Sequence, residues 1–330
     1  QRATSAAILP SVSRVKAEVF YNKASVFKKL VYCYMILGGV ALILALLGAL
    51  CGKRFMLAQK ILFAAFATSF AAHTLALALR WYVAAHAPWS DSYESMIYIG
   101  WSAALAGIIF FRKSLLTLSA SCLLASIVML VAHMSFVNPQ ITNLVPVLKS
   151  YWLSIHVSVI TASYGFLGLS CLLGLLALVL MALKNGANRE RLNAQIRYIT
   201  AINEISLIVG LSMLTLGNFF GGVWANESWG RYWGWDSKET WSYVSIIVYA
   251  IVLHLKFIPK LGSIYVYCVS STLAYSSIIM TYFGVNFYLT GMHSYAAGDA
   301  PQIPAPFYCI IAAIILIIAL AFRGRDVKTI

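Results

Sequence analysis

Six histidines and one tryptophan-rich stretch are the residues of this sequence whose types and spacing could do chemistry. The stretch WGRYWGWDSK runs from Trp229 to Lys238. The histidines are His73, His86, His133, His156, His254 and His293. An imidazole near a membrane surface can cap a helix, donate a hydrogen bond, titrate or bind a metal ion. A single histidine therefore selects none of these roles, and the choice depends on its neighbours.

The tryptophan-rich stretch belongs to a larger set of aromatic side chains that lie close together in the sequence. Flat aromatic faces suit a planar iron macrocycle, whose iron accepts one histidine nitrogen from each face of the ring. We therefore predict that this set binds haem together with His156 and His293. The aromatic belt at a membrane interface is the alternative, but a belt spreads thinly over many helix ends. The set is Trp224, Trp229, Tyr232, Trp233, Trp235 and Trp241.

The end of the stretch also predicts local structure without any ligand. Asp236 is followed three residues later by Glu239, a spacing typical of a capping box, in which both carboxylates accept from backbone amides at a helix start. The helix that begins here carries His254, about 20 Å beyond Trp241 at 1.5 Å per residue. An ionisable side chain that deep in a membrane is a candidate functional residue. A neutral histidine bonded to a neighbouring helix is the alternative. His73 also lies within a span but has no comparable neighbours in the sequence, so it is interpreted as structural.

Membrane-spanning helices must position these residues. Of the 330 residues, 61% are hydrophobic and 10% are charged, and the mean hydropathy is +0.83, far above the balance of a soluble domain. Apolar runs long enough to cross about 30 Å of hydrocarbon predict about nine spans. We expect an all-α bundle, because open sheet edges are not satisfied in lipid. The predicted spans are residues 30–51, 59–79, 93–111, 115–134, 152–183, 200–222, 241–258, 262–284 and 307–322.

The positive charges predict which loops face the cytoplasm. The net charge is +14, and Lys and Arg follow the first, third, fifth, seventh and last spans. The positive-inside rule places these loops and the C-terminus in the cytoplasm. The loops at 80–92, 135–151, 223–240 and 285–306 then face outward, so the tryptophan-rich loop is external. Because the charge lies between spans, it does not indicate a nucleic-acid partner.

The N-terminal part is expected to belong to a longer protein. An odd number of spans puts the N-terminus outside, where its basic residues contradict the positive-inside rule, and the sequence opens on Gln1. Long external segments cross the membrane largely regardless of charge, so an upstream external domain would account for both observations. No signal peptide is visible.

Other patterns argue against several classes of function. The six cysteines stand alone, and neither CxxC nor CxxCH occurs, so a thiol oxidoreductase and a c-type cytochrome are not expected. No glycine-rich phosphate loop is present, so an ATP-driven transporter would need its motor on another chain.

Four blocks resemble the cytochrome c synthases of the System II pathway, the CcsA (ResC) proteins of the haem-handling superfamily named for its WWD domain. HAPWSDSYES (86–95) is similar to a signature of that family, and LVPVLKSYWLSIHVS (144–158) to the segment leading into its first external histidine. GGVWANESWGRYWGWDSKETW (221–241) resembles the WWD domain itself, and GMHSYA (291–296) the second external histidine. Ser237 stands where relatives commonly carry Pro, and either residue suits a first helical turn.

The resemblance implies roles for these residues. His156 and His293 would be the axial ligands of haem b at the outer face, and His254 would be one ligand of a second haem within the membrane. The two outer histidines would act in catalysis together with Trp233, Trp235 and Asp236. The haem-binding residues of the WWD domain would be Trp224, Trp229, Gly230, Tyr232, Trp233, Trp235, Asp236, Lys238 and Trp241.

The resemblance also implies partners and a location. In this family the second histidine of the membrane site belongs to the CcsB (ResB) part, encoded separately or fused upstream. Residues 1–51 would then be an external segment and the last helix of a CcsB-like part, and 52–330 the CcsA-like haem-handling domain, with the WWD motif at 224–241. The substrate protein would be the CxxCH segment of apocytochrome c, with thiol reductant proteins acting indirectly. The expected location is the bacterial inner membrane, with the active site facing the periplasm.

The implied function is haem transport and covalent haem attachment, that is, holocytochrome c synthase activity. His254 would receive haem from the cytoplasmic side, and the outer pair would hold it while the thiols of the peptide attack. Positioning would supply most of the catalysis. Arg231, Lys238 or Asn226 could bind the haem propionates. The alternatives are a haem-delivery module without lyase activity and a dihaem electron-transfer protein, which would need histidine pairs on facing helices.

Overall fold

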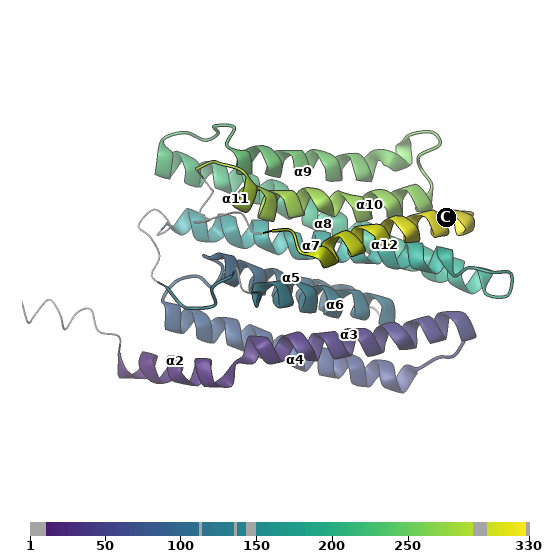
Figure 1. The fold of residues 1–330 in the computed structure, drawn as a ribbon, viewed down its shortest axis with the longest axis horizontal. Coiled ribbons are helices and arrows are strands. Elements are labelled where there is room, and N and C mark those ends of the chain that lie inside the picture. Colours follow the sequence, from purple (N-terminus) through teal and green to yellow (C-terminus); the bar gives the residue numbers. More distant parts are fainter. Residues whose placement is uncertain (1–10, 112–113, 135–136, 143–149, 293–301, 328–330) are drawn as a thin grey trace, which may run out of the picture.

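Long helices run side by side along the longest axis of the molecule (Figure 1). The structure is a computed structural model that describes residues 11–111, 114–134, 137–142, 150–292 and 302–327. Over these residues the regular structure is helical. The helices are α2 (Val12–Ala24), α3 (Val26–Cys51), α4 (Met56–Ala84), α5 (Ser92–Phe110), α6 (Leu115–Ala132), α7 (Tyr151–Ala182), α8 (Arg189–Trp229), α9 (Ser237–His254), α10 (Ile264–Ile279), α11 (Val285–Tyr288) and α12 (Ala305–Ala321).

Nine helical segments of the described chain are long and apolar enough to cross a membrane. They correspond one to one with the nine predicted spans, so the expected polytopic helical bundle is confirmed. The first segment joins α2 to α3, with a break at Ser25, whose backbone is left-handed (φ 46). The eighth joins α10 to α11 through a π-helical turn at Met280–Gly284.

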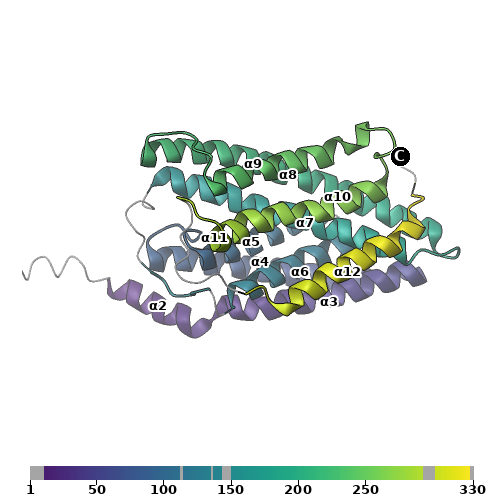
Figure 2. The same ribbon diagram turned by 45° about the horizontal axis from the view of Figure 1, so that its top comes forward.

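The two ends of the bundle differ in composition. The end on the left of Figure 1 holds α11 and the loops at 85–91, 230–236 and 289–292, and we call it the aromatic end. The opposite end holds the loops at 52–55, 183–188 and 255–263. We call it the basic end, because these loops carry Lys53, Arg54, Lys184, Lys256 and Lys260. Figure 2 shows the same separation after a turn of the molecule. Because successive helices alternate in direction, the described parts of the predicted external loops share one end.

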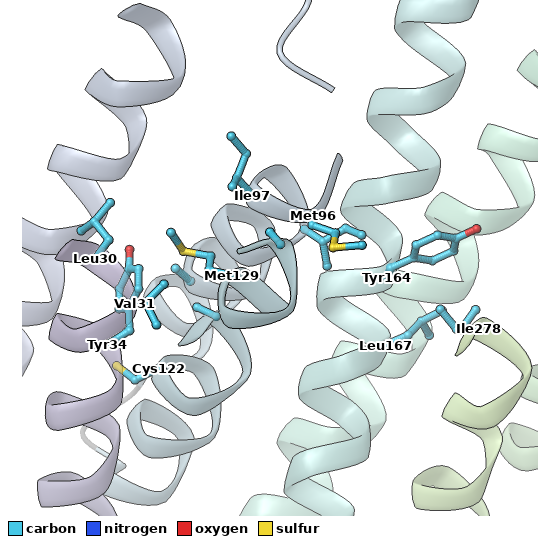
Figure 3. Packing of buried hydrophobic residues seen from close by; sticks show 14 of the residues in the cluster. Leu30, Val31, Tyr34, Met96, Ile97, Cys122, Met129, Tyr164, Leu167 and Ile278 are labelled. Atoms are coloured by element: carbon cyan, nitrogen blue, oxygen red, sulfur yellow. The ribbon is translucent and has the colours of Figure 1, made fainter. Parts of the chain in front are cut away.

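Polar side chains in the core bond to the backbones of neighbouring helices. Ser119 and Ser126 of α6 donate to the carbonyl oxygens of Gly38 and Val31 of α3, at 2.9 and 3.0 Å. Small residues let membrane helices approach closely, and such bonds hold the pair together. Helix α3 is therefore packed into the same bundle as the rest, while the domain division at residue 51 stays a prediction. Figure 3 shows this core, with Leu30, Val31, Tyr34, Met96, Ile97, Cys122, Met129, Tyr164, Leu167 and Ile278 labelled.

Helix α8 is longer than the sequence predicted. The span was expected to end at residue 222, but the helix continues to Trp229, so Trp224 lies on a helix rather than in a loop. Nothing in the intervening residues breaks a helix until Gly230, which adopts a left-handed backbone (φ 72) and donates its N–H to the Asn226 carbonyl at 2.9 Å. Such a glycine is the usual helix stop signal. The tryptophan-rich loop is therefore shortened to residues 230–236.

Candidate functional site

A cavity of about 500 Å³ opens at the aromatic end of the bundle. Its size is within the range of about 300–1,000 Å³ that is usual for small-molecule sites. It is lined by the starts of α5, α7 and α9, the end of α8, the residues around α11, and the segment 137–142. Three of the four sequence blocks singled out above therefore contribute to one site. His156, Trp224, Tyr232, Trp233 and Lys238 are the predicted site residues that line it.

His156 is held in one orientation by the neighbouring helix. Its ring nitrogen Nδ1 lies 2.7 Å from the carbonyl oxygen of Gly217 on α8. A carbonyl only accepts, so Nδ1 carries the proton, and in the neutral ring Nε2 carries the lone pair. Metal-binding histidines are typically fixed in this way, because the second nitrogen donates to a carbonyl or carboxylate. The imidazole also stacks on Trp224, with ring centroids 6.3 Å apart and planes 10° apart.

Gly221 gives the His156 ring the space that it occupies. A Cβ atom at position 221 would lie 2.5 Å from Cε1 and 2.7 Å from Nδ1 of His156. Those distances are far below ordinary contact, so any other residue would displace the ring. The first glycine of the GGVWAN segment is therefore explained by the close approach of the histidine.

The aromatic side chains divide into two groups. Trp224, Tyr232 and Trp233 line the cavity. Trp229 packs edge-to-face on Trp224, with ring centroids 4.7 Å apart. Trp235 is 69% exposed, has a left-handed backbone (φ 59), and packs edge-to-face on Trp233. Trp229, Gly230, Trp235, Asp236 and Trp241 are not among the residues that line the cavity.

The predicted capping box at the start of α9 is confirmed. Asp236 is the N-cap, and its carboxylate accepts from Lys238 N at 3.2 Å. Glu239 accepts from the backbone N–H groups of Gly234 and Asp236, at 2.8 and 3.2 Å. The buried Glu239 carboxylate thereby fixes the turn of the WWD loop against the helix start.

One wall of the cavity presents amide and amine groups. Lys238 Nζ donates to Asn286 Oδ1 at 2.9 Å, and the Ser242 hydroxyl donates to Asn218 Oδ1 at 2.8 Å. All four residues line the cavity. An ammonium and amides beside aromatic faces suit an amphiphilic ligand with carboxylate groups. Sequence inspection missed Asn218 and Asn286, because no local pattern distinguishes a cavity-lining asparagine from one that caps a helix.

A buried ion pair holds together the elements that carry part of the cavity lining. Arg80 of α4 and Glu94 of α5 are fully buried, and Nε donates to Oε1 at 2.8 Å. Arg80 also donates to Tyr21 of α2 at 2.8 Å and to the Pro139 carbonyl at 3.1 Å. The pair therefore ties α2, α4, α5 and the cavity-lining segment 137–142 together.

Asp91 lies beside this ion pair and lines the cavity. It caps α5 by accepting from Glu94 N at 2.7 Å, and it lies 3.9 Å from Arg80. Burial and the neighbouring Glu94 carboxylate raise the pKa of Asp91 to about 6. The HAPWSDSYES block is thus a structural frame that also brings one titratable group to the cavity wall.

The π-helical turn brings two further residues to the cavity. Tyr282 bonds to the hydroxyl of Ser95 at 2.6 Å and donates to the carbonyl of Ser92 at 3.1 Å. Thr281 donates to the Trp241 carbonyl at 3.1 Å. A π-helical turn shifts the face that a helix presents, and such turns are frequent at functional sites.

The other histidines lie away from this cavity. His254 is the last residue of α9, exposed, and its Nδ1 donates to the Ala250 carbonyl of its own helix at 2.7 Å. It therefore lies at the basic end of its span, nearer the end than expected. His73 is buried and bonds to Tyr34 and to the Ile97 carbonyl, as its structural interpretation requires. His293 lies outside the described residues.

His86 and His133 also make local bonds. His86 Nε2 donates to the Thr142 carbonyl at 3.3 Å, and Nδ1 lies 3.7 Å from Glu94. His133 follows α6 and donates to the Met129 carbonyl at 2.7 Å. Among the described residues, no group of three or more His, Cys, Asp and Glu side chains could hold a metal ion.

Comparison with known proteins identifies the family. The family described as cytochrome C assembly protein matches residues 89–293, the part that contains His156, the WWD segment and most of the cavity wall. The chain belongs to this family. It is 51% identical over 300 residues to protein NrfI of Wolinella succinogenes, covering 88% of this chain and 32% of NrfI. The chain thus spans about a third of that relative.

Relatives named cytochrome c biogenesis protein CcsA are matched over a larger share of their length. The protein of Prochlorococcus marinus strain MIT 9301 is 32% identical over 248 residues, covering 67% of this chain and 80% of the relative. The protein of Chlamydomonas reinhardtii is 34% identical over 232 residues, covering 67% and 64%. The expected kinship with CcsA proteins is confirmed.

Proposed function

We propose that this protein holds haem in the outer cavity while the thiols of a CxxCH segment of apocytochrome c add to it, as a holocytochrome c synthase. The observation that carries the proposal is His156, which is fixed by Gly217 and stacked on Trp224 at the wall of a ligand-sized cavity. His293 would supply the second axial nitrogen. Membership of the cytochrome C assembly family supports the same substrate class.

The reaction requires positioning rather than a protein nucleophile. Each thiol adds across one vinyl group of haem b: the S–H and C=C π bonds break, and a thioether C–S bond and a C–H bond form. No electrons are gained or lost in this step. Trp224 and Trp233 would orient the ring, and Lys238 with Asn286 would bind a propionate. Holding both reactants makes the step effectively unimolecular.

The route of haem and the orientation of the chain follow from the two ends. Basic residues collect at the end that carries His254, so the positive-inside rule places that end in the cytoplasm of a bacterial inner membrane. The outer cavity would face the periplasm. His254, exposed at the surface of this chain, would receive haem together with a histidine of a CcsB-like part. Thiol reductant proteins would act indirectly, by keeping the peptide thiols reduced.

The test is the optical spectrum of the protein purified with its natural upstream part. We expect the spectrum of low-spin haem. This spectrum should be weaker in His156→Gly, and added imidazole should restore it. His133→Ala is the matched control, because His133 donates its hydrogen bond within α6 and, while its ring packs edge-to-face on Tyr93, does not itself line the cavity. Intact protein without haem under haem-replete growth would contradict the proposal, as would an unchanged spectrum in His156→Gly.

Two alternatives predict other outcomes. A haem-delivery module would show the same spectrum but would form no thioether when the haem-loaded protein is mixed with a reduced CxxCH peptide. Covalent haem on the denatured peptide therefore decides between delivery and synthesis. A dihaem electron-transfer protein needs facing histidine pairs within the bilayer, and His73, the described histidine that is buried within a span, uses both ring nitrogens in core hydrogen bonds.

A further inference from the structure

A second cavity, of about 460 Å³, lies at the basic end of the bundle. It is formed by α8, by the 3₁₀ turn Leu255–Phe257 that follows α9, and by the loop that leads into α10. Its volume is within the range that is usual for small-molecule sites. No histidine is among the described residues that line it, so binding of the haem iron does not account for this cavity.

This cavity lies where three predicted membrane spans begin or end. The predicted spans 200–222 and 262–284 begin beside it, and the span 241–258 ends beside it. Thr200 and Gly262, at two of these boundaries, line the cavity. Because the loops at this end are basic, the positive-inside rule places the cavity at the cytoplasmic surface of the bilayer. The groups that surround it there are lipid headgroups.

Arg197 supplies the positive charge of the cavity wall. The wall also holds Lys256 and Glu204, but these two neutralise each other, because Lys256 Nζ donates to Glu204 Oε1 at 2.6 Å. Arg197 is only partly buried and forms no ion pair with a carboxylate of the described residues. The parallel N–H groups of a guanidinium match two oxygens of a phosphate. The cavity therefore favours an anionic ligand.

Hydroxyl groups at the start of α10 line the same cavity. Ser263 is the N-cap of α10, and its Oγ accepts from Val266 N at 3.2 Å. That bond leaves the O–H of Ser263 available as a donor to a ligand oxygen. Tyr267 is held in place by donating its hydroxyl to Asn203 Oδ1 at 3.3 Å. These groups add polar contacts to the charge of the wall.

An apolar face of α8 leads from the cavity into the membrane. Ala201 lines the cavity, and Ile205 and Ile208 follow about one and two turns further along the same face of the helix. All three residues are exposed. Leu216 and Phe219, which are also exposed, continue this face toward the aromatic end. A molecule whose charged head lies in the cavity can therefore lay an apolar chain along α8.

We propose that the basic-end cavity binds the headgroup of an anionic phospholipid, with Arg197 on the phosphate and an acyl chain along Ile205 and Ile208. Basic pockets between membrane helices on the cytoplasmic side bind lipid headgroups in this way. A free phosphate ion shares the headgroup chemistry but gains nothing from the apolar face of α8. The bound lipid stabilises the folded chain by mass action. This proposal is independent of haem binding at the aromatic end.

The first test measures lipid binding to the protein with its natural upstream part, by native mass spectrometry in detergent. Phosphatidylglycerol should bind more tightly than phosphatidylcholine. Arg197→Ala should weaken the binding of phosphatidylglycerol about tenfold or more, because hydrogen bonds to a charged group are lost. Arg197→Lys keeps the charge but loses the fork of the guanidinium, so its affinity should lie between. Arg54→Ala is the matched control, because Arg54 is exposed at the same end and does not line the cavity.

Glu204→Gln should bind the same lipid more tightly. The substitution removes the carboxylate from the cavity wall and releases Lys256 to bind the phosphate. We expect a gain of about threefold in affinity for phosphatidylglycerol, the size of a partly exposed ion pair. Damage to the fold can only weaken binding, so a gain of affinity reports the cavity itself. Unchanged or weaker binding in Glu204→Gln would contradict the proposed contacts.

A second experiment locates the acyl chain. Phosphatidylglycerol that carries a photoreactive group in its acyl chain should cross-link to α8 around Ile205 and Ile208, and this cross-link should be lost in Arg197→Ala but kept in Arg54→Ala. A cross-link elsewhere on the chain, unchanged in Arg197→Ala, would overturn the proposal.

Other outcomes of the binding test would assign the cavity differently. Equal affinity for phosphatidylglycerol and phosphatidylcholine, or full affinity for phosphatidylglycerol in Arg197→Ala, would overturn the proposal. If inorganic phosphate displaces phosphatidylglycerol as effectively as the lipid displaces itself, the ligand is a free anion rather than a lipid. If haem displaces the lipid more effectively than phosphatidylglycerol does, the cavity binds the haem carboxylates and the lipid assignment is wrong.

Discussion

His156 differs from His133 and His254 in the partner of its Nδ1 nitrogen. His133 and His254 donate to carbonyls one turn earlier in their own helices, at 2.7 Å each, as a histidine near a helix end can do anywhere. His156 donates across to Gly217 on another helix. A bond between helices fixes the ring relative to the cavity, whereas a bond within one helix does not. The sequence pointed to His156 as a candidate ligand, but only the structure distinguishes the two kinds of bond.

The space for this ring is testable at Gly221. In Gly221→Ala the added methyl would lie 2.5 Å from the His156 ring, and relieving such overpacking costs about 1–3 kcal/mol. We expect about tenfold weaker haem retention, with the protein still inserted in the membrane. The control is Gly39→Ala, since nothing lies near that Cβ position. Equal haem retention in the two variants would show that the ring position does not matter.

The raised pKa of Asp91 predicts a pH dependence of stability. Because the folded-state pKa of about 6 exceeds the ordinary value of 3.8, the folded state favours the protonated carboxyl. That stabilisation is complete below about pH 4 and is lost as the pH rises through about 6. Asp91→Asn mimics the protonated form and keeps the cap on α5. As the pH rises from about 4 to about 6, we expect the thermal unfolding midpoint of Asp91→Asn to increase relative to that of the unaltered protein. Parallel curves would contradict the assignment.

The sequence predicts helices where a long apolar run marks them, but it does not predict helical turns made of mixed aromatic and polar residues. All nine spans follow from apolar runs, because hydrocarbon thickness sets their length. The last two turns of α8 were missed, since residues 223–229 mix aromatic and polar side chains that resemble a loop. The π-helical turn at Met280–Gly284 leaves no sequence signal either. Both missed features lie at the cavity, where tertiary contacts rather than propensity decide the local structure.

The Arg80–Glu94 pair is an element-scale contact, because it joins α4 to α5 and reaches α2 and the segment 137–142. Arg80→Ala would leave the Glu94 carboxylate buried without its cation, at a cost of about 3–5 kcal/mol. We expect a lower thermal unfolding midpoint in detergent and less protein in the membrane. Combining Arg80→Met with Glu94→Gln should recover part of the loss, since the buried charge is then removed.

Arg54→Ala provides the control for this prediction. Arg54 is exposed at the basic end, and surface substitutions usually change stability by less than about 0.5 kcal/mol. If Arg80→Ala unfolds at the same temperature as Arg54→Ala, the ion pair does not hold the frame together.

At the scale of the whole molecule, the two candidate haem positions lie at opposite ends of one helix. Asp236 caps the start of α9 beside the outer cavity, and His254 is its last residue. With 18 residues, α9 is about 27 Å long, roughly the hydrocarbon thickness. In the proposed function, haem that binds first at His254 would therefore have to cross the membrane before it reaches His156. The sequence predicted this separation, because helix length and charge placement are properties of the chain alone.

This arrangement predicts an order of events. We expect His254→Ala to lower haem occupancy of the outer cavity in haem-limited cells, because supply from the basic end fails, while the cavity itself stays intact. Haem added to the aromatic side of isolated membranes should then restore the low-spin spectrum in His254→Ala but not in His156→Gly. The measurement is the haem spectrum per amount of protein, with His133→Ala as the control. Full outer occupancy of His254→Ala in haem-limited cells would place His254 off the route. Failure of added haem to restore the spectrum would mean that His254 also supports the outer cavity.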